Sequence, residues 1–146
     1  MRMTANAHKD YSGTPLWKKL GIAEGSRVRV LDAPDVLERE LTALAPLPAG
    51  VSFLTRTGRD LDVILAFVTR GSTLRKRIDP LARAIAPAGR LWIAWPKRAA
   101  ATDTDVDFDL VQRAGLATGL VDNKSASITD VFQGVQFVRR KADRPR

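Results

Sequence analysis

Hydrophobic residues along this chain recur with two periods, and each period predicts a different kind of element. Short runs that alternate apolar with polar residues, or are apolar throughout, are typical of strands, whereas apolar residues three or four positions apart are typical of helices. The strand pattern occurs at residues 26–31, 51–55, 61–68, 90–95, 120–128 and 135–140. The helix pattern occurs at residues 14–21, 34–44, 72–85 and about 104–114.

Turn and capping residues set the expected bounds of these elements. Thr14 is expected to cap the first helix, with Pro15 at its first position and Gly21 just past its end. Ser72 is expected to cap the third helix, and the turn residues 87–89 to separate that helix from the next strand.

The alternation of strands and helices predicts the fold class. Residues 61–68 are apolar nearly throughout, as in a strand covered on both faces of a parallel sheet, and the short loop 129–134 allows the last two strands to pair antiparallel. We predict a three-layer, Rossmann-like α/β domain with strand order 2-1-3-4-6-5, its last strand antiparallel and the others parallel. Residues 1–10 are expected to be disordered or draped, 11–141 to form one domain and 142–146 a basic tail.

Length and composition narrow the class of protein. A chain of 146 residues is long enough for one hydrophobic core, and it has no apolar run of the roughly 20 residues that a membrane helix needs. The N-terminus has no signal-peptide pattern, and the absence of cysteine excludes disulfides and thiolate metal sites. We therefore expect a bacterial protein of the cytoplasm that spans no membrane.

The net charge of +8 suggests a polyanionic partner, but its distribution weakens that interpretation. Residues 139–146 hold five basic residues and one acidic residue, hence +4, so half of the excess lies at one end of the chain. No helix-turn-helix and no series of aromatic residues interleaved with basic ones is recognisable. Only weak, non-specific binding to nucleic acid is expected.

The order of elements resembles that of an S-adenosylmethionine-dependent methyltransferase domain with one central strand–helix unit missing. This resemblance implies a cofactor at the first strand–helix turn, where a glycine-rich loop lets the backbone approach the ligand. Here that turn, residues 31–35, has no glycine, Pro34 has no N–H to donate, and Ala33 and Pro34 fill space that glycines leave open. No cofactor is therefore predicted.

Several short motifs carry a second resemblance, which covers about residues 11–141. They are Tyr11-Ser12-Gly13-Thr14-Pro15-Leu16, Lys19-Leu20-Gly21-Ile22, Trp95-Pro96-Lys97, Gly119-Leu120-Val121-Asp122 and Gly134-Val135-Gln136-Phe137-Val138. Together they resemble a bacterial family catalogued as domain of unknown function 3052. The resemblance implies no activity, substrate or catalytic residue.

Residues that commonly carry chemistry have simpler explanations here. His8 is the only histidine and lies near the N-terminus, so no catalytic residue is predicted. The carboxylates of residues 103–109 are expected to cap a helix and interact with its dipole rather than bind a metal. Trp92 and Trp95, three positions apart on one strand, are expected on opposite faces of the sheet.

Basic residues follow several of the predicted strands, at the edge where open parallel sheets bind ligands. The predicted ligand-binding residues are Arg56, Arg70, Trp95, Lys97, Arg98 and Lys124. Their charges could equally be solvated surface. The leading hypothesis is a non-catalytic binding or regulatory module for an anionic small molecule. The alternatives are a divergent methyltransferase-like or nucleotide-using enzyme and a weak nucleic-acid-associated protein.

Overall fold

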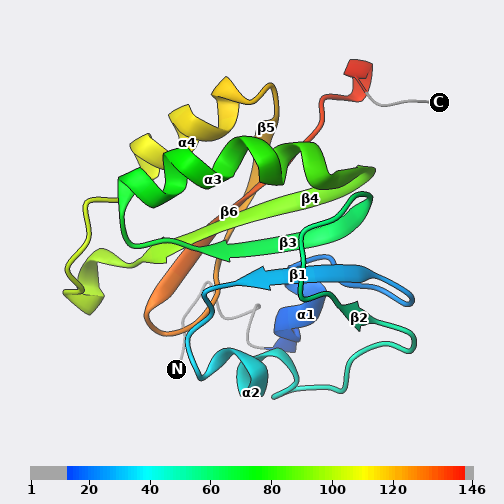
Figure 1. The fold of residues 1–146 in the computed structure, drawn as a ribbon. Helices are drawn as coiled ribbons and strands as arrows, with labels where there is room; N and C mark the ends of the chain where they lie inside the picture. Colours follow the sequence, from blue (N-terminus) through cyan, green and yellow to red (C-terminus); the bar gives the residue numbers. More distant parts are fainter. Residues whose placement is uncertain (1–12, 144–146) are drawn as a thin grey trace.

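A six-stranded sheet forms the centre of the protein, for which a computed structural model describes residues 13–143 (Figure 1). Its order is β2-β1-β3-β4-β6-β5. The strands are β1 (Arg27–Leu31), β2 (Ser52–Phe53), β3 (Leu61–Phe67), β4 (Ile85–Pro96), β5 (Val121–Ser127) and β6 (Phe132–Val138). β6 is antiparallel to both of its neighbours, and β1 to β4 are parallel. The predicted fold class and strand order are confirmed.

Helices cover both faces of the sheet and complete three layers. α1 (Leu16–Lys19) and α2 (Leu37–Leu41) pack on one face, and α3 (Gly71–Ala84) and α4 (Phe108–Ala117) on the other. Side chains of β3 alternate between these faces, so Val63 and Leu65 contact the α1–α2 core and Ile64 and Ala66 the α3–α4 core. All four are at most 1% exposed, as the apolar run 61–68 predicted.

Two helices begin or end differently from the prediction. The predicted helix 34–44 is the five-residue α2, which ends at Leu41, and Leu44 beyond it is 58% exposed. Pro15, not Thr14, holds the N-cap position of α1, and no side chain caps that helix. Gly21 lies just past the end of α1, as predicted, and its φ of +89° is in the left-handed region that glycine commonly adopts there.

The caps of α3 and α4 also differ from the prediction. α3 begins at Gly71 rather than after Ser72, and the Gly71 N–H donates to Asp105 Oδ1 at 2.7 Å. α4 begins at Phe108 rather than near residue 104, with Asp107 as its N-cap. A residue 34 positions away therefore caps α3, which the local sequence could not reveal.

β4 starts earlier than predicted and contains a bulge where the sequence suggested a break. Ile85 pairs with Leu61 and Arg90 with Val63, so residues 86–89 lie between two paired positions. A Cβ on Gly89 would lie 2.6 Å from the Leu61 carbonyl oxygen, hence only glycine fits this close approach.

Some expectations lie outside the described residues, namely those for residues 1–10, for His8 and for the last three positions of the basic tail. Residues 141–143 form a short 3-10 turn. Within residues 13–143, no helix is both long and apolar enough to cross a membrane.

Candidate functional site

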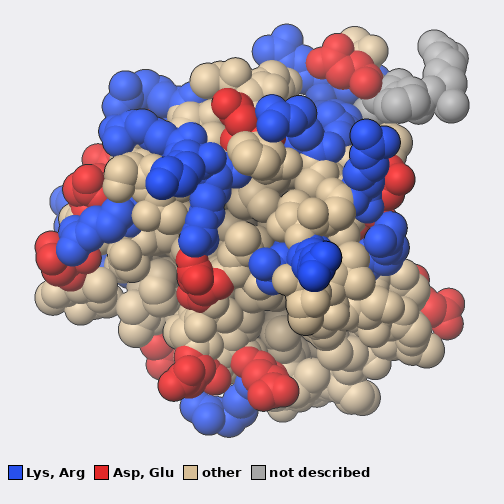
Figure 2. Space-filling model, viewed as in Figure 1, with Lys and Arg blue, Asp and Glu red and all other residues tan. Residues whose placement is uncertain are grey.

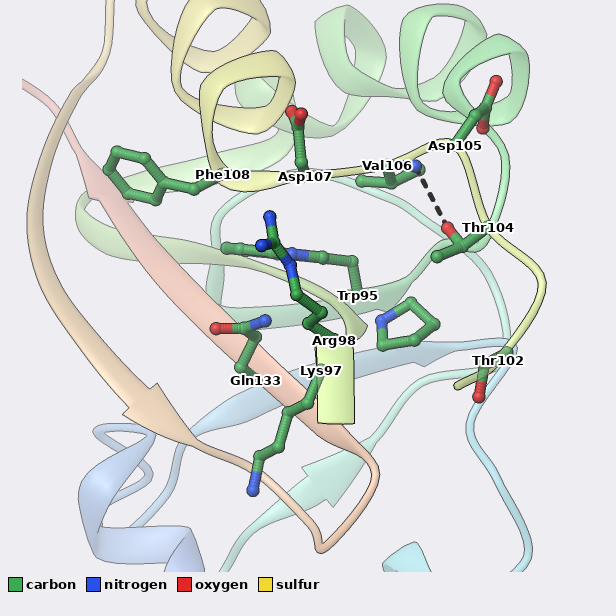
Figure 3. Close-up of a pocket in the computed structure, with 11 residues that line it drawn as sticks. Trp95, Lys97, Arg98, Thr102, Thr104, Asp105, Val106, Asp107, Phe108 and Gln133 are labelled. Atoms are coloured by element: carbon green, nitrogen blue, oxygen red, sulfur yellow. Dashed lines mark hydrogen bonds between the residues drawn. The ribbon is translucent and has the colours of Figure 1, made fainter. Parts of the chain in front are cut away.

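A cleft of about 460 Å³ opens at the carboxyl edge of the sheet, between the end of β4 and the start of α4 (Figure 3). Its walls come from residues 95–98, from Thr102 and residues 104–108, and from Gln133 of β6. A second hollow shares Trp95, Lys97, Arg98 and Phe108 with it and extends along β6 to residues 125–127 of β5. We call the first of these cavities the β4–α4 cleft.

The turn after β4 positions Arg98. The Lys97 N–H donates to the Val131 carbonyl at 2.7 Å, and the 3-10 turn Arg98–Ala100 is closed by the Ala100 N–H on the Lys97 carbonyl. Figure 3 shows the Arg98 guanidinium directed toward the start of α4, whereas the Lys97 side chain runs the opposite way. No hydrogen bond or ion pair joins the Arg98 side chain to another residue of the described chain.

Hydrogen bonds fix the opposite wall of the cleft to two helices. Thr104 Oγ1 donates to the Thr69 carbonyl at 2.7 Å and accepts from the Val106 N–H at 3.0 Å. Asp105 caps α3, and Asp107 Oδ1 accepts from the Leu110 N–H of α4 at 2.9 Å. The two carboxylates that line the cleft are therefore helix caps, as predicted for the acidic run, although Asp105 caps a different helix.

Two aromatic rings form the apolar part of the cleft. Trp95 is 3% exposed and belongs to its floor, whereas Phe108 is 47% exposed at its rim. Their ring centres are 6.4 Å apart, with a tilt of 45°. Trp92 faces the α1–α2 core and donates its indole N–H to the Leu20 carbonyl at 3.0 Å, which confirms that the two tryptophans lie on opposite faces.

The structure brings together three of the six predicted ligand-binding residues, Trp95, Lys97 and Arg98. Arg56 lies in the connection from β2 to β3, and three strand spacings separate β2 from β4, about 14 Å. Arg70 pairs with Asp103 at 2.8 Å. The hydrogen bond and the charge of Asp103 raise the pKa of Arg70, and the same hydrogen bond and the charge of Arg70 lower the pKa of Asp103.

Lys124 lies in the middle of β5, paired with Gln136, and not at the carboxyl end of a strand as predicted. Its Nζ donates to the Lys19 carbonyl at 2.8 Å and lies 5.9 Å from the centre of the Trp92 ring, on the α1 side of the sheet. Lys97 Nζ donates to Ser127 Oγ at 2.7 Å. Burial lowers the pKa of Lys19, and the charges of Lys124 and Lys97 lower it further.

The predicted basic rim is thus divided between the two sides of the sheet. The β4–α4 cleft is lined by Asp105 and Asp107 as well as by Lys97 and Arg98, so its lining is not uniformly basic. Figure 2 shows lysine and arginine gathered over α3, while acidic side chains surround α2. Phe108 and Gln133 also line the cleft but were not predicted from the sequence. For Phe108, the one available signal was an aromatic residue directly after an aspartate that could cap a helix.

The first strand–helix turn does not fit a cofactor held by a glycine-rich loop. α2 has only five residues, Pro34 has no N–H, and Asp32 takes a left-handed φ of +56°. The Asp32 carboxylate pairs with Arg77 of α3. A cavity of about 490 Å³ beside this turn has apolar walls, and its charged lining residues are Asp35 and Glu38.

Solved S-adenosylmethionine-dependent methyltransferases have the same overall arrangement. A TehB-like methyltransferase from Corynebacterium glutamicum is 12% identical over 86% of this chain and 85% of its own, with a TM-score of 0.52. The chain has a methyltransferase-like fold. Magnesium protoporphyrin IX methyltransferase from Synechocystis, with bound S-adenosylmethionine, is 10% identical over 86% of this chain and 74% of its own, with a TM-score of 0.54.

Precorrin-6y C5,15-methyltransferase from Geobacter metallireducens is 9% identical over 86% of both chains, with a TM-score of 0.53. At these identities the likeness concerns the fold alone. No protein-family model and no curated protein sequence matches the chain. Its resemblance to the domain of unknown function therefore stays a prediction.

Proposed function

We propose that this chain is a divergent methyltransferase-like enzyme that binds a small molecule with an anionic group in the β4–α4 cleft. The observation that carries the proposal is the Arg98 guanidinium, which points into a cavity at the carboxyl edge of the sheet. Ligands of open α/β sheets bind at this edge, and a guanidinium fork suits a carboxylate or phosphate. The methyltransferase-like fold favours an enzyme.

A non-catalytic module that binds the same anionic molecule is the second candidate. It is favoured by the first strand–helix turn, where Pro34 and the short α2 leave no glycine loop and no long helix to hold a cofactor. An enzyme of this fold needs cofactor contacts outside that turn. The two candidates therefore differ in whether the chain binds an adenosyl cofactor at all.

Calorimetric titration with S-adenosylmethionine and S-adenosylhomocysteine separates the candidates. The enzyme is expected to bind at least one of them with a dissociation constant in the micromolar range, about −8 kcal/mol. Arg98→Gln should weaken binding of an anionic substrate, whereas the matched Arg39→Gln, exposed on α2 across the sheet, should not. Failure of both adenosyl compounds to bind would reject the enzyme in favour of the module.

Weak nucleic-acid binding stays a separate prediction. The exposed Arg75 and Lys76 of α3 give it a surface, but Arg70 and Arg77 beside them are paired with aspartates. Binding through phosphates should fall steeply with salt, by a slope of about −0.9 per contact on duplex DNA. Fluorescence anisotropy at about 150 mM salt is expected to show little residual binding.

A further inference from the structure

The β4–α4 cleft combines one available cation with two carboxylates. The Arg98 side chain has no hydrogen-bond or ion-pair partner among residues 13–143. The Lys97 side chain runs in the opposite direction, and its Nζ donates a hydrogen bond to Ser127 Oγ. Asp105 and Asp107 belong to the wall, where each accepts a backbone N–H at the start of a helix. An anion that enters the cleft can pair with the Arg98 guanidinium and is repelled by the two carboxylates, whereas the Lys97 ammonium is directed away from it.

This balance of charge selects among anions. A singly charged group can pair with Arg98 through two parallel hydrogen bonds and present no further charge to the wall. A doubly charged phosphate brings a second negative charge into a cavity of about 460 Å³, where Asp105 and Asp107 lie within screening distance of it. The cleft therefore disfavours phosphates relative to monocarboxylates.

The apolar part of the cleft selects shape. Phe108 exposes about half of its surface at the rim, and Trp95 lies below it with its ring tilted by 45°. Flat aromatic molecules contact such rings in stacked or edge-to-face arrangements and gain more than an aliphatic group of equal size. Figure 3 shows the Arg98 guanidinium directed toward the start of α4, where Phe108 is the first residue, so an acid group and a ring can be bound together.

We propose that the β4–α4 cleft recognises a planar aromatic monocarboxylate, with the carboxylate on Arg98 and the ring against the exposed Phe108, above the buried Trp95. This inference rests on the proposed function, because it takes the cleft to be the ligand site. It names the substrate class of that site and excludes phosphate esters and nucleotides as its preferred ligands.

Calorimetry with three probes tests the proposal: 2-naphthoate, its saturated analogue decahydro-2-naphthoate and inorganic phosphate. Wild-type protein is expected to bind 2-naphthoate at least about tenfold more tightly than either of the others, a difference of about 1.4 kcal/mol. Arg98→Gln should lower the affinity for 2-naphthoate by at least about tenfold. Phe108→Leu should abolish the preference for the planar acid over the saturated acid and leave the affinity for phosphate unchanged. Arg39→Gln is the control and should change nothing.

Asp107→Asn provides an independent readout. Asparagine caps a helix about as well as aspartate, so the variant removes a charge and keeps α4. Its affinity for phosphate should rise by a larger factor than its affinity for 2-naphthoate.

Equal binding of the planar and saturated acids, or tighter binding of phosphate than of 2-naphthoate, would overturn the inference and leave the proposed function standing. If 2-naphthoate does not bind at millimolar concentration, the inference is wrong. The titration with S-adenosylhomocysteine then decides the proposed function separately, since that compound needs no aromatic acid pocket.

Discussion

Helices of 14 and 10 residues cover the α3–α4 face of the sheet, whereas the α1–α2 face carries helices of four and five residues. The two long helices start at the carboxyl edge, and the residues that cap them, Asp105 and Asp107, form a wall of the β4–α4 cleft. α2 also starts at that edge, but it has only five residues and no side-chain cap. The candidate site thus lies on the face whose helices are long and have aspartate caps.

The two faces should respond differently to the loss of a buried leucine, and this is the largest expected effect. Leu74 of α3 is 1% exposed in the larger core, so Leu74→Ala should cost about 2–5 kcal/mol of unfolding free energy. Leu37→Ala in α2, where Leu37 is 4% exposed, should cost less, because a five-residue helix can collapse onto the space left. Urea denaturation measures both, and equal losses would contradict the comparison.

Adding a methyl group where α4 contacts β6 should have the next largest effect on stability. A Cβ at Gly115 would lie 2.1 Å from the Phe137 ring, so Gly115→Ala should destabilise the protein by about 1–3 kcal/mol. Gly58→Ala is the matched control, since nothing lies within 4 Å of its Cβ position and its φ is not positive. Thermal melts that show no difference between the two variants would mean that α4 is not tightly packed on β6.

The long-range cap of α3 should contribute less than the core. Asp105→Ala removes the acceptor of the Gly71 N–H and should cost about 1 kcal/mol, whereas Asp105→Asn should retain most of the stability. Urea midpoints of the two variants measure the difference. A loss in the asparagine variant as large as in the alanine variant would mean that charge, not capping, is what α3 needs.

The exposed pair of Arg70 and Asp103 should have the smallest effect, visible as a dependence on pH. Because Arg70 lowers the pKa of Asp103 in the folded protein, the pair stabilises the fold above the ordinary aspartate pKa of 3.8. That stabilisation is lost as the pH falls through the lowered pKa. The urea midpoints of wild type and Asp103→Asn should differ slightly at neutral pH and converge in acid; a constant difference would contradict this.

Sequence patterns were enough to predict the fold, because α3 has the spacing of an amphipathic helix and β3 is a short apolar run of the kind buried in a parallel sheet. The candidate site was predicted only in part. Which cations meet depends on tertiary contacts: the Lys97 side chain bonds to Ser127, and Lys124 bonds to the Lys19 carbonyl on the α1 side of the sheet. Asp105 caps a helix distant in sequence, which no local signal indicates.

The three tryptophans allow a direct test of where the ligand lies. Trp95 belongs to the β4–α4 cleft, whereas Trp17 donates its indole N–H to the Ala45 carbonyl near α2 and Trp92 faces the α1–α2 core. In an NMR titration of nitrogen-15-labelled protein with 2-naphthoate, the Trp95 indole resonance should shift through the ring current of the ligand, and those of Trp17 and Trp92 should stay in place. Shifts at Trp17 with none at Trp95 would contradict the account and place the ligand beside the first strand–helix turn.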